Sequence, residues 1–179
     1  MKKLSLEELN RLSPEEYRKV SPVPVVVVLD NIRSGLNVGS LFRTADAFRI
    51  EKIFCLGITA RPPHREILKT ALGATDTVPW EGVEDGVGLV ASLKAEGYTI
   101  LAVEQAEPSV PLNEFKPDIN RKYAVVLGNE VGGVSDDIME LADTALEIPQ
   151  FGTKHSLNVA VCGGIVIWHL AGVWLWGEE

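Results

Sequence analysis

Short apolar runs alternate along the chain with longer, helix-like stretches. The apolar runs predict strands at Val25–Leu29, Ile53–Leu56, Thr99–Val103, Tyr123–Leu127 and Ala145–Ile148. Helices are expected near Ser40–Phe48, Arg65–Leu72, Gly86–Glu96 and Asp136–Ala142, with a long apolar helix over Val159–Trp176. The strands are continuous apolar runs such as VVVVL, which is typical of strands buried on both faces. The pattern therefore predicts an α/β fold in which a parallel sheet carries helices on both faces.

Two helix-start signals precede the first strand. Ser5 is followed by Glu8, and Ser13-Pro14-Glu15-Glu16 places serine at the cap, proline at the first helical position and glutamate at the third. We therefore divide the chain into a short N-terminal helical segment, 1–20, and one α/β domain, 21–179, as a length of 179 residues allows.

The composition is that of an ordinary globular protein, with 46% hydrophobic and 23% charged residues. Cys55 and Cys162 lie in apolar runs and form no Cys-x-x-Cys motif, and His64, His155 and His169 lack metal-ligand spacing. Residues 1–19 are rich in Lys, Glu and Arg, so we expect no secretion leader. We expect no disulfide, no metal site, and a reducing, cytoplasmic location.

The last apolar stretch, Val159–Trp176, reaches the lower length limit of a membrane span, with His169 as its one ionisable group. No cationic residue follows it to orient a span. Trp168, Trp174 and Trp176 lie within it, and tryptophan is enriched at protein interfaces. We expect a homodimer through this helix rather than a membrane contact.

Charge is unevenly distributed over the chain, whose net charge is −8. Residues 1–70 hold 12 Lys and Arg against 8 Asp and Glu, whereas residues 71–179 hold 5 against 17. The basic first part indicates a face for an anionic partner. The alternative is that these residues only solvate helix faces.

Ligands of open parallel sheets bind beyond the carboxyl ends of the strands. The loops that follow the predicted strands at 30–48, 128–135 and 149–158 are rich in Asn, Gly, Ser and charged residues. Neither the dinucleotide G-x-G-x-x-G, the P-loop nor the G-x-S-x-G elbow is present. Gly128, Gly132 and Gly133 would let the backbone approach a ligand, or would merely form the turn into a helix capped by Ser135.

Asn37 and Arg43 are candidate ligands of a phosphate or ribose oxygen. If a helix begins near Ser40, Arg43 lies one turn inside it and reaches back over its start. Alternatively, Arg43 pairs with Asp30 or Asp46 as part of the scaffold.

Three ordered motifs give the chain a family resemblance. It resembles the SpoU (TrmH-like) RNA ribose 2′-O-methyltransferases of the SPOUT superfamily in NVGSLFR (37–43), VVLGNEVGG (125–133), and IPQFG (148–152) with SLNVA (156–160). LGA (72–74) is also similar to the mid-chain signature of that family. GYTILAVEQ (97–105) is similar to the branch that contains tRNA D-loop guanosine methylases. Many relatives have Met in place of Gln150 and Ser in place of Ala160.

The resemblance implies that 21–179 is a SPOUT methyltransferase domain with a C-terminal trefoil knot, an obligate homodimer and S-adenosylmethionine as cofactor. By position, Val103, Gly128, Ile148 and Leu157 would contact that cofactor. The implied catalytic set is Arg43, Asn37, Glu130, Ser156 and Asn158.

The implied substrate is RNA, either tRNA with a D-loop guanosine favoured or rRNA, recognised by the dimer core and the N-terminal helices. Arg43 would act as base or as a stabiliser of phosphate and alkoxide, and the second role fits the permanent charge of arginine. On local grounds alone, Ser156 and Asn158 could simply cap the last helix. The rival hypothesis is a non-catalytic RNA-binding or regulatory protein with the same fold.

Overall fold

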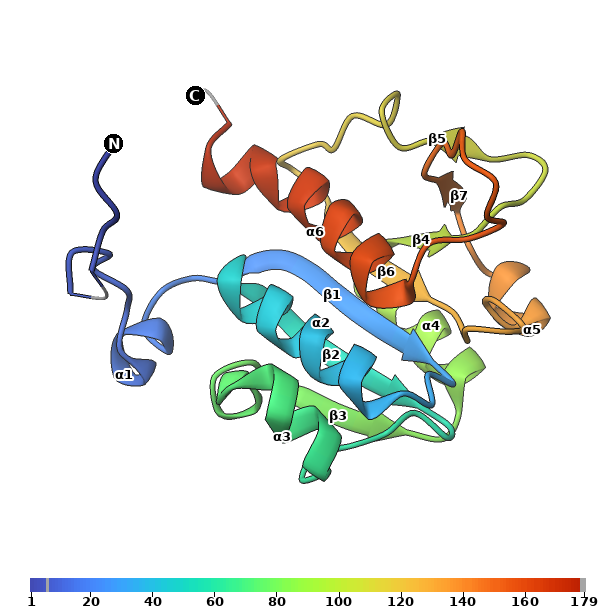
Figure 1. The fold of residues 1–179 in the computed structure, drawn as a ribbon. Coiled ribbons are helices and arrows are strands. Elements are labelled where there is room, and N and C mark those ends of the chain that lie inside the picture. The colour runs from blue at the N-terminus through green and yellow to red at the C-terminus, as the bar shows by residue number, and fades with distance from the viewer. Residues whose placement is uncertain (6, 178–179) are drawn as a thin grey trace.

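The fold is a parallel α/β sheet, seen in a computed structural model that describes residues 1–5 and 7–177 (Figure 1). Within these residues seven strands pair in the order β3-β2-β1-β6-β4-β7-β5, and every pair is parallel. The strands are β1 (Val23–Asp30), β2 (Ile50–Leu56), β3 (Trp80–Val83), β4 (Tyr98–Val103), β5 (Val110–Pro111), β6 (Lys122–Leu127) and β7 (Thr144–Glu147). The helices are α1 (Pro14–Tyr17), α2 (Gly35–Ala47), α3 (Arg65–Ala71), α4 (Gly86–Ala95), α5 (Asp136–Met139) and α6 (Val159–Leu175), with a 3₁₀ turn at Ala74–Asp76.

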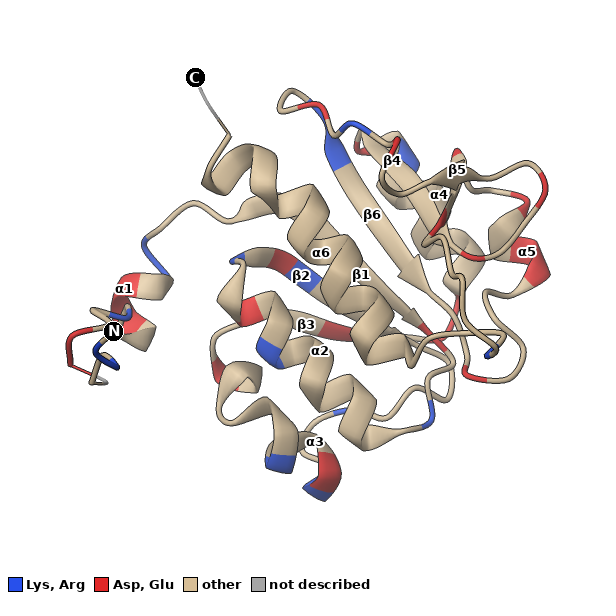
Figure 2. Ribbon diagram, turned by 45° about the horizontal axis from the view of Figure 1, so that its top comes forward, with Lys and Arg blue, Asp and Glu red and all other residues tan. Residues whose placement is uncertain are grey.

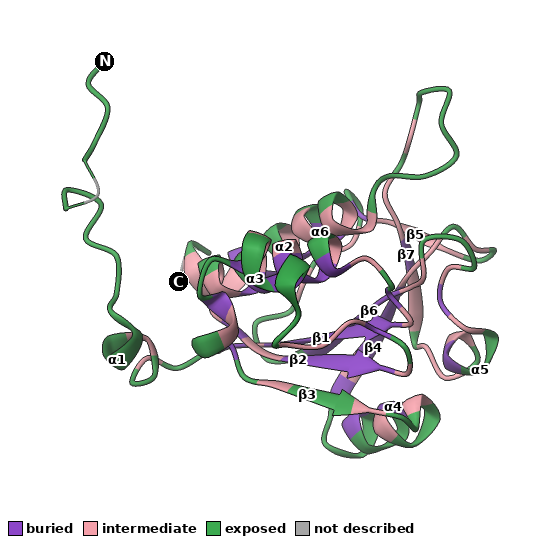
Figure 3. Cartoon of the chain, turned by 60° about the horizontal axis from the view of Figure 1, so that its bottom comes forward, coloured by how far each residue is buried: buried purple, intermediate pink, exposed green. Residues whose placement is uncertain are grey.

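Both faces of the sheet are covered, as the apolar runs predict. Val25, Val27 and Leu29 of β1 face the core beneath α2, α3 and α6. Val26 and Val28 alternate with them and face the core beneath α4 and α5. Figure 3 shows these two helical layers on opposite sides of the buried strands.

The edge strands β3 and β5 were not predicted. β3 is only partly buried and β5 has two residues, so neither presents a continuous apolar run. The predicted helix over Asp136–Ala142 is also shorter in the structure, where α5 ends at Met139.

The expected start of α2 near Ser40 is wrong. The helix begins at Gly35, because the Ser34 side chain caps it by accepting a hydrogen bond from the Asn37 amide at 3.3 Å. Asn37 therefore lies in the first turn, and Arg43 lies more than two turns inside the helix. Arg43 cannot reach back over the helix start from there.

The N-terminal segment stands away from the sheet (Figure 1). The capping box at Ser13 and Glu16 is present and starts α1, as predicted. The Ser5 amide donates to Glu8 Oε2 at 2.7 Å, but residues 7–10 form a turn, so the helix expected there is wrong.

Helix α6 packs closely on α2 and β6 through Gly163. A Cβ atom at this position would lie 2.5 Å from Leu41 Cδ2 and 2.7 Å from Leu127 Cδ1. His169 Nε2 lies 2.8 Å from the Phe115 carbonyl oxygen, so its polar atom is satisfied inside the fold. No helix in the described residues is long and apolar enough to cross a membrane.

The tryptophans of the last stretch divide between two environments. Trp168 and Trp176 are 55% and 52% exposed, and their ring centroids lie 5.6 Å apart. Trp174 instead packs against Tyr123, with ring centroids 6.1 Å apart, and its Nε1 donates to the Ile119 carbonyl at 3.2 Å. This inward packing weighs against a place for Trp174 at an intermolecular face, which stays a prediction.

Candidate active site

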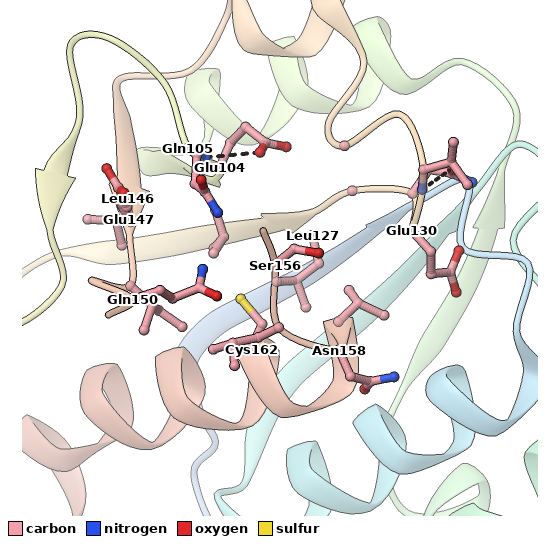
Figure 4. A pocket seen from close by; sticks show the side chains of 18 residues that line it. Glu104, Gln105, Leu127, Glu130, Leu146, Glu147, Gln150, Ser156, Asn158 and Cys162 are labelled. Atoms are coloured by element: carbon pink, nitrogen blue, oxygen red, sulfur yellow. Dashed lines mark hydrogen bonds between the residues drawn. The ribbon is translucent and has the colours of Figure 1, made fainter. Parts of the chain in front are cut away.

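A cavity of about 400 Å³ opens at the carboxyl ends of β4, β6 and β7 (Figure 4). The loops after these three strands form its walls, together with the start of α6. This is the edge of the sheet at which the sequence places the ligand.

The four residues predicted to contact a cofactor all line this cavity. Val103 ends β4, Gly128 follows β6, Ile148 follows β7, and Leu157 precedes α6. The fold thus brings together residues that lie up to 54 positions apart in the sequence, between Val103 and Leu157. Their contact with a cofactor remains a prediction.

Asn129 shapes the loop after β6. Its Oδ1 accepts hydrogen bonds from the amides of Val131 at 2.9 Å and Gly132 at 3.2 Å. Its Nδ2 donates to the carbonyl oxygen of Asn31 at 2.7 Å, which joins this loop to the end of β1. The side chain therefore holds the turn from inside.

The geometry of the turn itself accounts for two of the three loop glycines. A Cβ atom on Gly128 would lie 2.1 Å from the backbone carbon of Gly133, and Gly133 has a φ of +69°. Both positions therefore require glycine for the turn. Around Gly132, in contrast, the space is open.

Asp30 fixes the other end of the same loop. This carboxylate is 2% exposed and accepts hydrogen bonds from the Ser135 amide at 2.7 Å and the Ser135 hydroxyl at 2.6 Å. Asp46 accepts a hydrogen bond from the Thr77 hydroxyl. In the described part of the chain neither carboxylate pairs with Arg43, so the scaffold alternative for Arg43 is wrong.

A chain of side-chain hydrogen bonds crosses the rim of the cavity. Asn158 Nδ2 donates to Asn37 Oδ1 at 3.1 Å, and Asn37 Nδ2 donates to Glu130 Oε1 at 3.1 Å. Asn158 also caps α6, because its Oδ1 accepts from the Ala160 amide at 2.9 Å. The starts of α2 and α6 and the loop after β6 are thereby joined.

Glu130 is held in its ionised form. Partial burial works to raise the pKa of its carboxyl, but hydrogen bonds outweigh that effect and lower the pKa below its usual value. The donors are its own backbone amide, the Asn37 side chain, and the amides of Ser34 and Arg33 before α2. A carboxylate at this helix start is also favoured by the helix dipole.

The remaining two predicted catalytic residues are placed differently. Ser156 lines the cavity beside Leu157. Arg43 does not line it; its side chain is exposed on the outer face of α2, with no hydrogen bond or ion pair to the rest of the described chain. The structure therefore brings together four of the five predicted catalytic residues.

Two acidic residues of the cavity, Glu104 and Glu147, were missed by the sequence analysis. Glu104 Oε2 accepts from the Val134 amide at 3.1 Å, and its Oε1 accepts from the Gln105 amide at 2.9 Å. The signal that could have found them is their position at the ends of β4 and β7. With Glu130 they supply every charged side chain among the described residues that line the cavity.

Gln150, one of the two departures from the family pattern, lines the cavity, whereas Ala160 does not. Cys162 lines it too, and burial, reinforced by the Glu104 carboxylate, raises the pKa of its thiol to about 11. No group of three or more potential metal ligands occurs in residues 1–5 and 7–177.

The parallel sheet, the cavity at its carboxyl edge and the glycine turn define an open-sheet α/β ligand-binding domain. The sequence model of the SpoU rRNA Methylase family matches residues 24–168, and the chain belongs to this family.

Relatives with known names act on two kinds of RNA. The chain is 31% identical to the 23S rRNA (guanosine-2′-O-)-methyltransferase RlmB of Neisseria meningitidis, covering 83% of this chain and 58% of that protein. It is 30% identical to the tRNA (guanosine(18)-2′-O)-methyltransferase of Aquifex aeolicus, covering 80% and 67%. A 23S rRNA (guanosine(2553)-2′-O)-methyltransferase of Bacillus subtilis is covered over 62% of its length. The chain thus spans about three fifths of the two rRNA relatives.

Solved structures of similar proteins share the fold. An AdoMet-bound rRNA methyltransferase from Sinorhizobium meliloti superposes with a TM-score of 0.79 at 27% identity, over 92% of this chain and 62% of that one. The TrmH/SpoU tRNA modifying enzyme of Aquifex aeolicus gives a TM-score of 0.78 at 27% identity, over 88% and 80%.

Proposed function

We propose that this protein transfers the methyl group of S-adenosylmethionine to a ribose 2′-hydroxyl of RNA. The observation that carries the proposal is the acidic cavity bordered by the hydrogen-bonded side chains of Asn158, Asn37 and Glu130. Membership of the SpoU family, whose relatives carry names of ribose methylation, supports it.

The residues of the cavity fit S-adenosylmethionine. Its volume of about 400 Å³ lies in the range of small-molecule sites, roughly 300 to 1,000 Å³. Its charged side chains are carboxylates, which suit a sulfonium cation and disfavour the phosphates of ATP or NAD. Val103, Gly128, Ile148 and Leu157 would hold the cofactor from the strand ends. When bound, it supplies an electrophilic methyl group.

The chain's own residues would then position the ribose. Methyl transfer is an in-line displacement, so holding the hydroxyl in place is a large part of the catalysis. Glu130 Oε1 is fixed by Asn37, and its ionised carboxylate can accept a hydrogen bond from the attacking hydroxyl. Ser156 would contact the ribose from the cavity wall.

Arg43 would act on the RNA backbone rather than as a base. Its guanidinium stays protonated and suits a bidentate contact with phosphate. Because it is exposed on α2 and away from the cavity, it would reach RNA outside the pocket of its own chain.

We further propose a homodimer that covers the outer face of α6. Val161, Ile165, Trp168 and Trp176 form an exposed apolar stripe on that helix and its end. Aromatic anchors of this kind are typical of interface cores. Trp174 takes no part, because it packs inward.

The proposal includes a C-terminal trefoil knot. β7 pairs with β4, whereas the next helix, α6, packs on α2 and β1 beyond β6. Residues 149–158 must therefore cross the ends of β4 and β6, and Gln105 Nε2 donates to the His155 carbonyl at 2.6 Å along this path. Such a crossing supports the knot that the family resemblance implies.

Within RNA we favour tRNA and a guanosine of its D-loop. This rests on the similarity of 97–105 to that branch and on tRNA (guanosine(18)) relatives in Aquifex aeolicus and Escherichia coli. An rRNA target is the second candidate, since relatives with rRNA names are equally similar.

Radiolabelled methyl transfer tests the function. Full-length protein is incubated with methyl-labelled S-adenosylmethionine and, separately, total tRNA and total rRNA, with Glu130→Gln as the impaired control. We expect label in RNA, and calorimetry should show binding of S-adenosylmethionine and its demethylated product in preference to ATP or NAD. Folded protein that binds RNA but transfers no label would instead support the non-catalytic alternative.

A further inference from the structure

A group of exposed cations lies on the surface of α3 and in the loop before α2. We call it the basic ridge, defined by Arg33, Arg65 and Lys69. All three side chains are exposed, and within residues 1–5 and 7–177 none forms an ion pair. Figure 2 shows basic segments on α3 and before α2, with one acidic segment on α3, Glu66, whereas acidic segments gather around α5 and the loop near β5.

The ridge is held rigidly on α2. A Cβ atom on Gly39 would lie 2.4 Å from the Ile67 carbonyl oxygen, and one on Gly35 would lie 2.9 Å from Glu66 Cβ. These two glycines, one helical turn apart, therefore form the groove in which α3 lies. Thr70 Oγ1 donates to the Leu36 carbonyl at 3.1 Å and ties the two helices together.

The ridge begins at the rim of the cavity. Leu36, which accepts that bond from α3, is followed directly by Asn37, which donates to Glu130. The ridge and the hydrogen-bonded rim thus share the first turn of α2. An RNA strand that places one nucleotide at Glu130 would pass over this surface or over the other side of the cavity.

Charge favours the ridge as the path of the backbone. Every charged group among the described residues lining the cavity is a carboxylate, so phosphates are repelled from it. A ribose can enter the cavity, but the phosphates on either side of that ribose are stabilised only by cations that lie outside the cavity. Arg33, Arg65 and Lys69 supply them without having to break an internal ion pair.

Some of the other basic residues are engaged within the fold. Arg61 donates to the Gly57 carbonyl at 3.0 Å and to Glu84 Oε1 at 2.6 Å. In the N-terminal segment, Lys2 pairs with Glu8 at 2.6 Å. Arg61 and Lys2 are therefore less available to RNA, whereas the exposed Lys3, Arg11 and Lys19 form no ion pair among the described residues and leave the N-terminal segment as a second RNA surface.

We propose that the basic ridge binds the phosphate backbone of the substrate RNA, next to the nucleotide that enters the cavity. This inference rests on the proposed function and assigns its substrate surface. Leu68 and Leu72, which are 48% and 67% exposed, lie beside the cations and provide apolar contact for a ribose or base.

The test compares two double variants with equal loss of charge. Arg65→Ala/Lys69→Ala removes two ridge cations. Lys116→Ala/Lys122→Ala removes two exposed cations at and before the start of β6, the end of that strand opposite to the cavity. Binding of total tRNA and of total rRNA is measured by fluorescence anisotropy at several salt concentrations. Light scattering gives the oligomeric mass, and calorimetry gives the affinity for S-adenosylmethionine.

The ridge variant should bind the substrate RNA about tenfold more weakly, and its log–log salt slope should fall by about 1.5 for two lost phosphate contacts. Its oligomeric mass and cofactor affinity should match those of the wild type, and the control should bind RNA as the wild type does. A ridge variant with wild-type affinity and slope overturns the inference. So does a change in its oligomeric mass, which would make the ridge a contact between protein chains.

Failure of the proposed function has a different signature. A wild-type protein that binds S-adenosylmethionine but neither RNA overturns both the function and the ridge. A wild-type protein that methylates RNA while the ridge variant binds that RNA normally overturns the ridge alone.

Discussion

Asn158 has two roles in the structure that one pair of substitutions can separate. Its Oδ1 caps α6 by accepting from the Ala160 and Val161 amides at 2.9 and 3.3 Å. Its Nδ2 donates to Asn37 Oδ1 and so supports the contact with Glu130. Asn158→Ala removes both roles, whereas Asn158→Asp keeps an acceptor for the cap and loses the donor.

The expected stabilities follow from these contacts. Loss of an asparagine cap costs about 1 kcal/mol, and an exposed neutral hydrogen bond contributes about 0.5 kcal/mol. Asn158→Ala should therefore lower the free energy of unfolding by about 1.5 kcal/mol. In Asn158→Asp the loss of the donor is offset by about 0.5 kcal/mol from a negative charge at the start of α6. That variant should be close to wild type.

Urea unfolding and methyl-transfer rates together separate the capping role of Asn158 from its role in holding Glu130. With an m-value of about 2 kcal/mol/M, the unfolding midpoint should shift by about 0.75 M for Asn158→Ala and little for Asn158→Asp. Both variants should lose turnover by about 10- to 100-fold, because the Glu130 carboxylate is no longer held in place. Wild-type turnover in Asn158→Asp would show that Asn158 is only a helix cap, and would refute the reasoning.

Four further predictions concern single side chains. Arg43→Ala should fold and bind cofactor normally but lose turnover by about 100- to 10,000-fold in steady-state methyl transfer. Arg43→Lys should recover little of that turnover if the guanidinium binds phosphate in a bidentate manner. An Arg43→Ala variant that keeps about a tenth of the wild-type rate would contradict a catalytic role. Trp168→Asp should yield a folded monomer by light scattering, and an unchanged dimer mass would place the interface elsewhere. Trp174→Asp should unfold, because Trp174 packs on Tyr123. Burial opposes the hydrogen bonds at Glu130, but these bonds lower the pKa of its carboxyl in the folded state. The stabilising effect of the ionised carboxylate is therefore present above the unfolded pKa and is lost as the pH falls through the folded pKa. In urea titrations Glu130→Gln should lose less stability than the wild type on acidification, and equal losses of stability would contradict this prediction. Because burial raises the pKa of the Cys162 thiol to about 11, its alkylation by iodoacetamide should be slow at neutral pH and rise steeply toward that value, with fast neutral reaction as the contrary result.

The central strands and the location of the site could be predicted from the sequence because both depend on local patterns. β1, β4 and β6 each contain an unbroken apolar run, and the polar loops after strands mark the ligand edge of a parallel sheet. The edge strands β3 and β5 are short and partly exposed, and they gain their place only by pairing with a neighbour.

The contacts within the site depend on tertiary structure and left no local signal. Ser34 sets the start of α2, and this decides that Asn37 meets Glu130 while Arg43 lies away from the cavity. The place of Glu104 directly after β4 puts it at the ligand edge, but nothing in the local sequence shows that it supports the turn after β6. Trp174 shares an apolar helix with Trp168, and only the packing of the 112–121 loop turns it inward.

The position of the transferred methyl group tests the central claim most directly. RNA is incubated with the protein and S-adenosylmethionine that carries a deuterated methyl group, then digested to nucleosides and analysed by mass spectrometry. We predict deuterated 2′-O-methylguanosine, with the label on the ribose and absent from the base, and a greatly reduced signal for Asn158→Asp. Label on a base, or no labelled nucleoside from folded protein that binds the cofactor, would contradict the account.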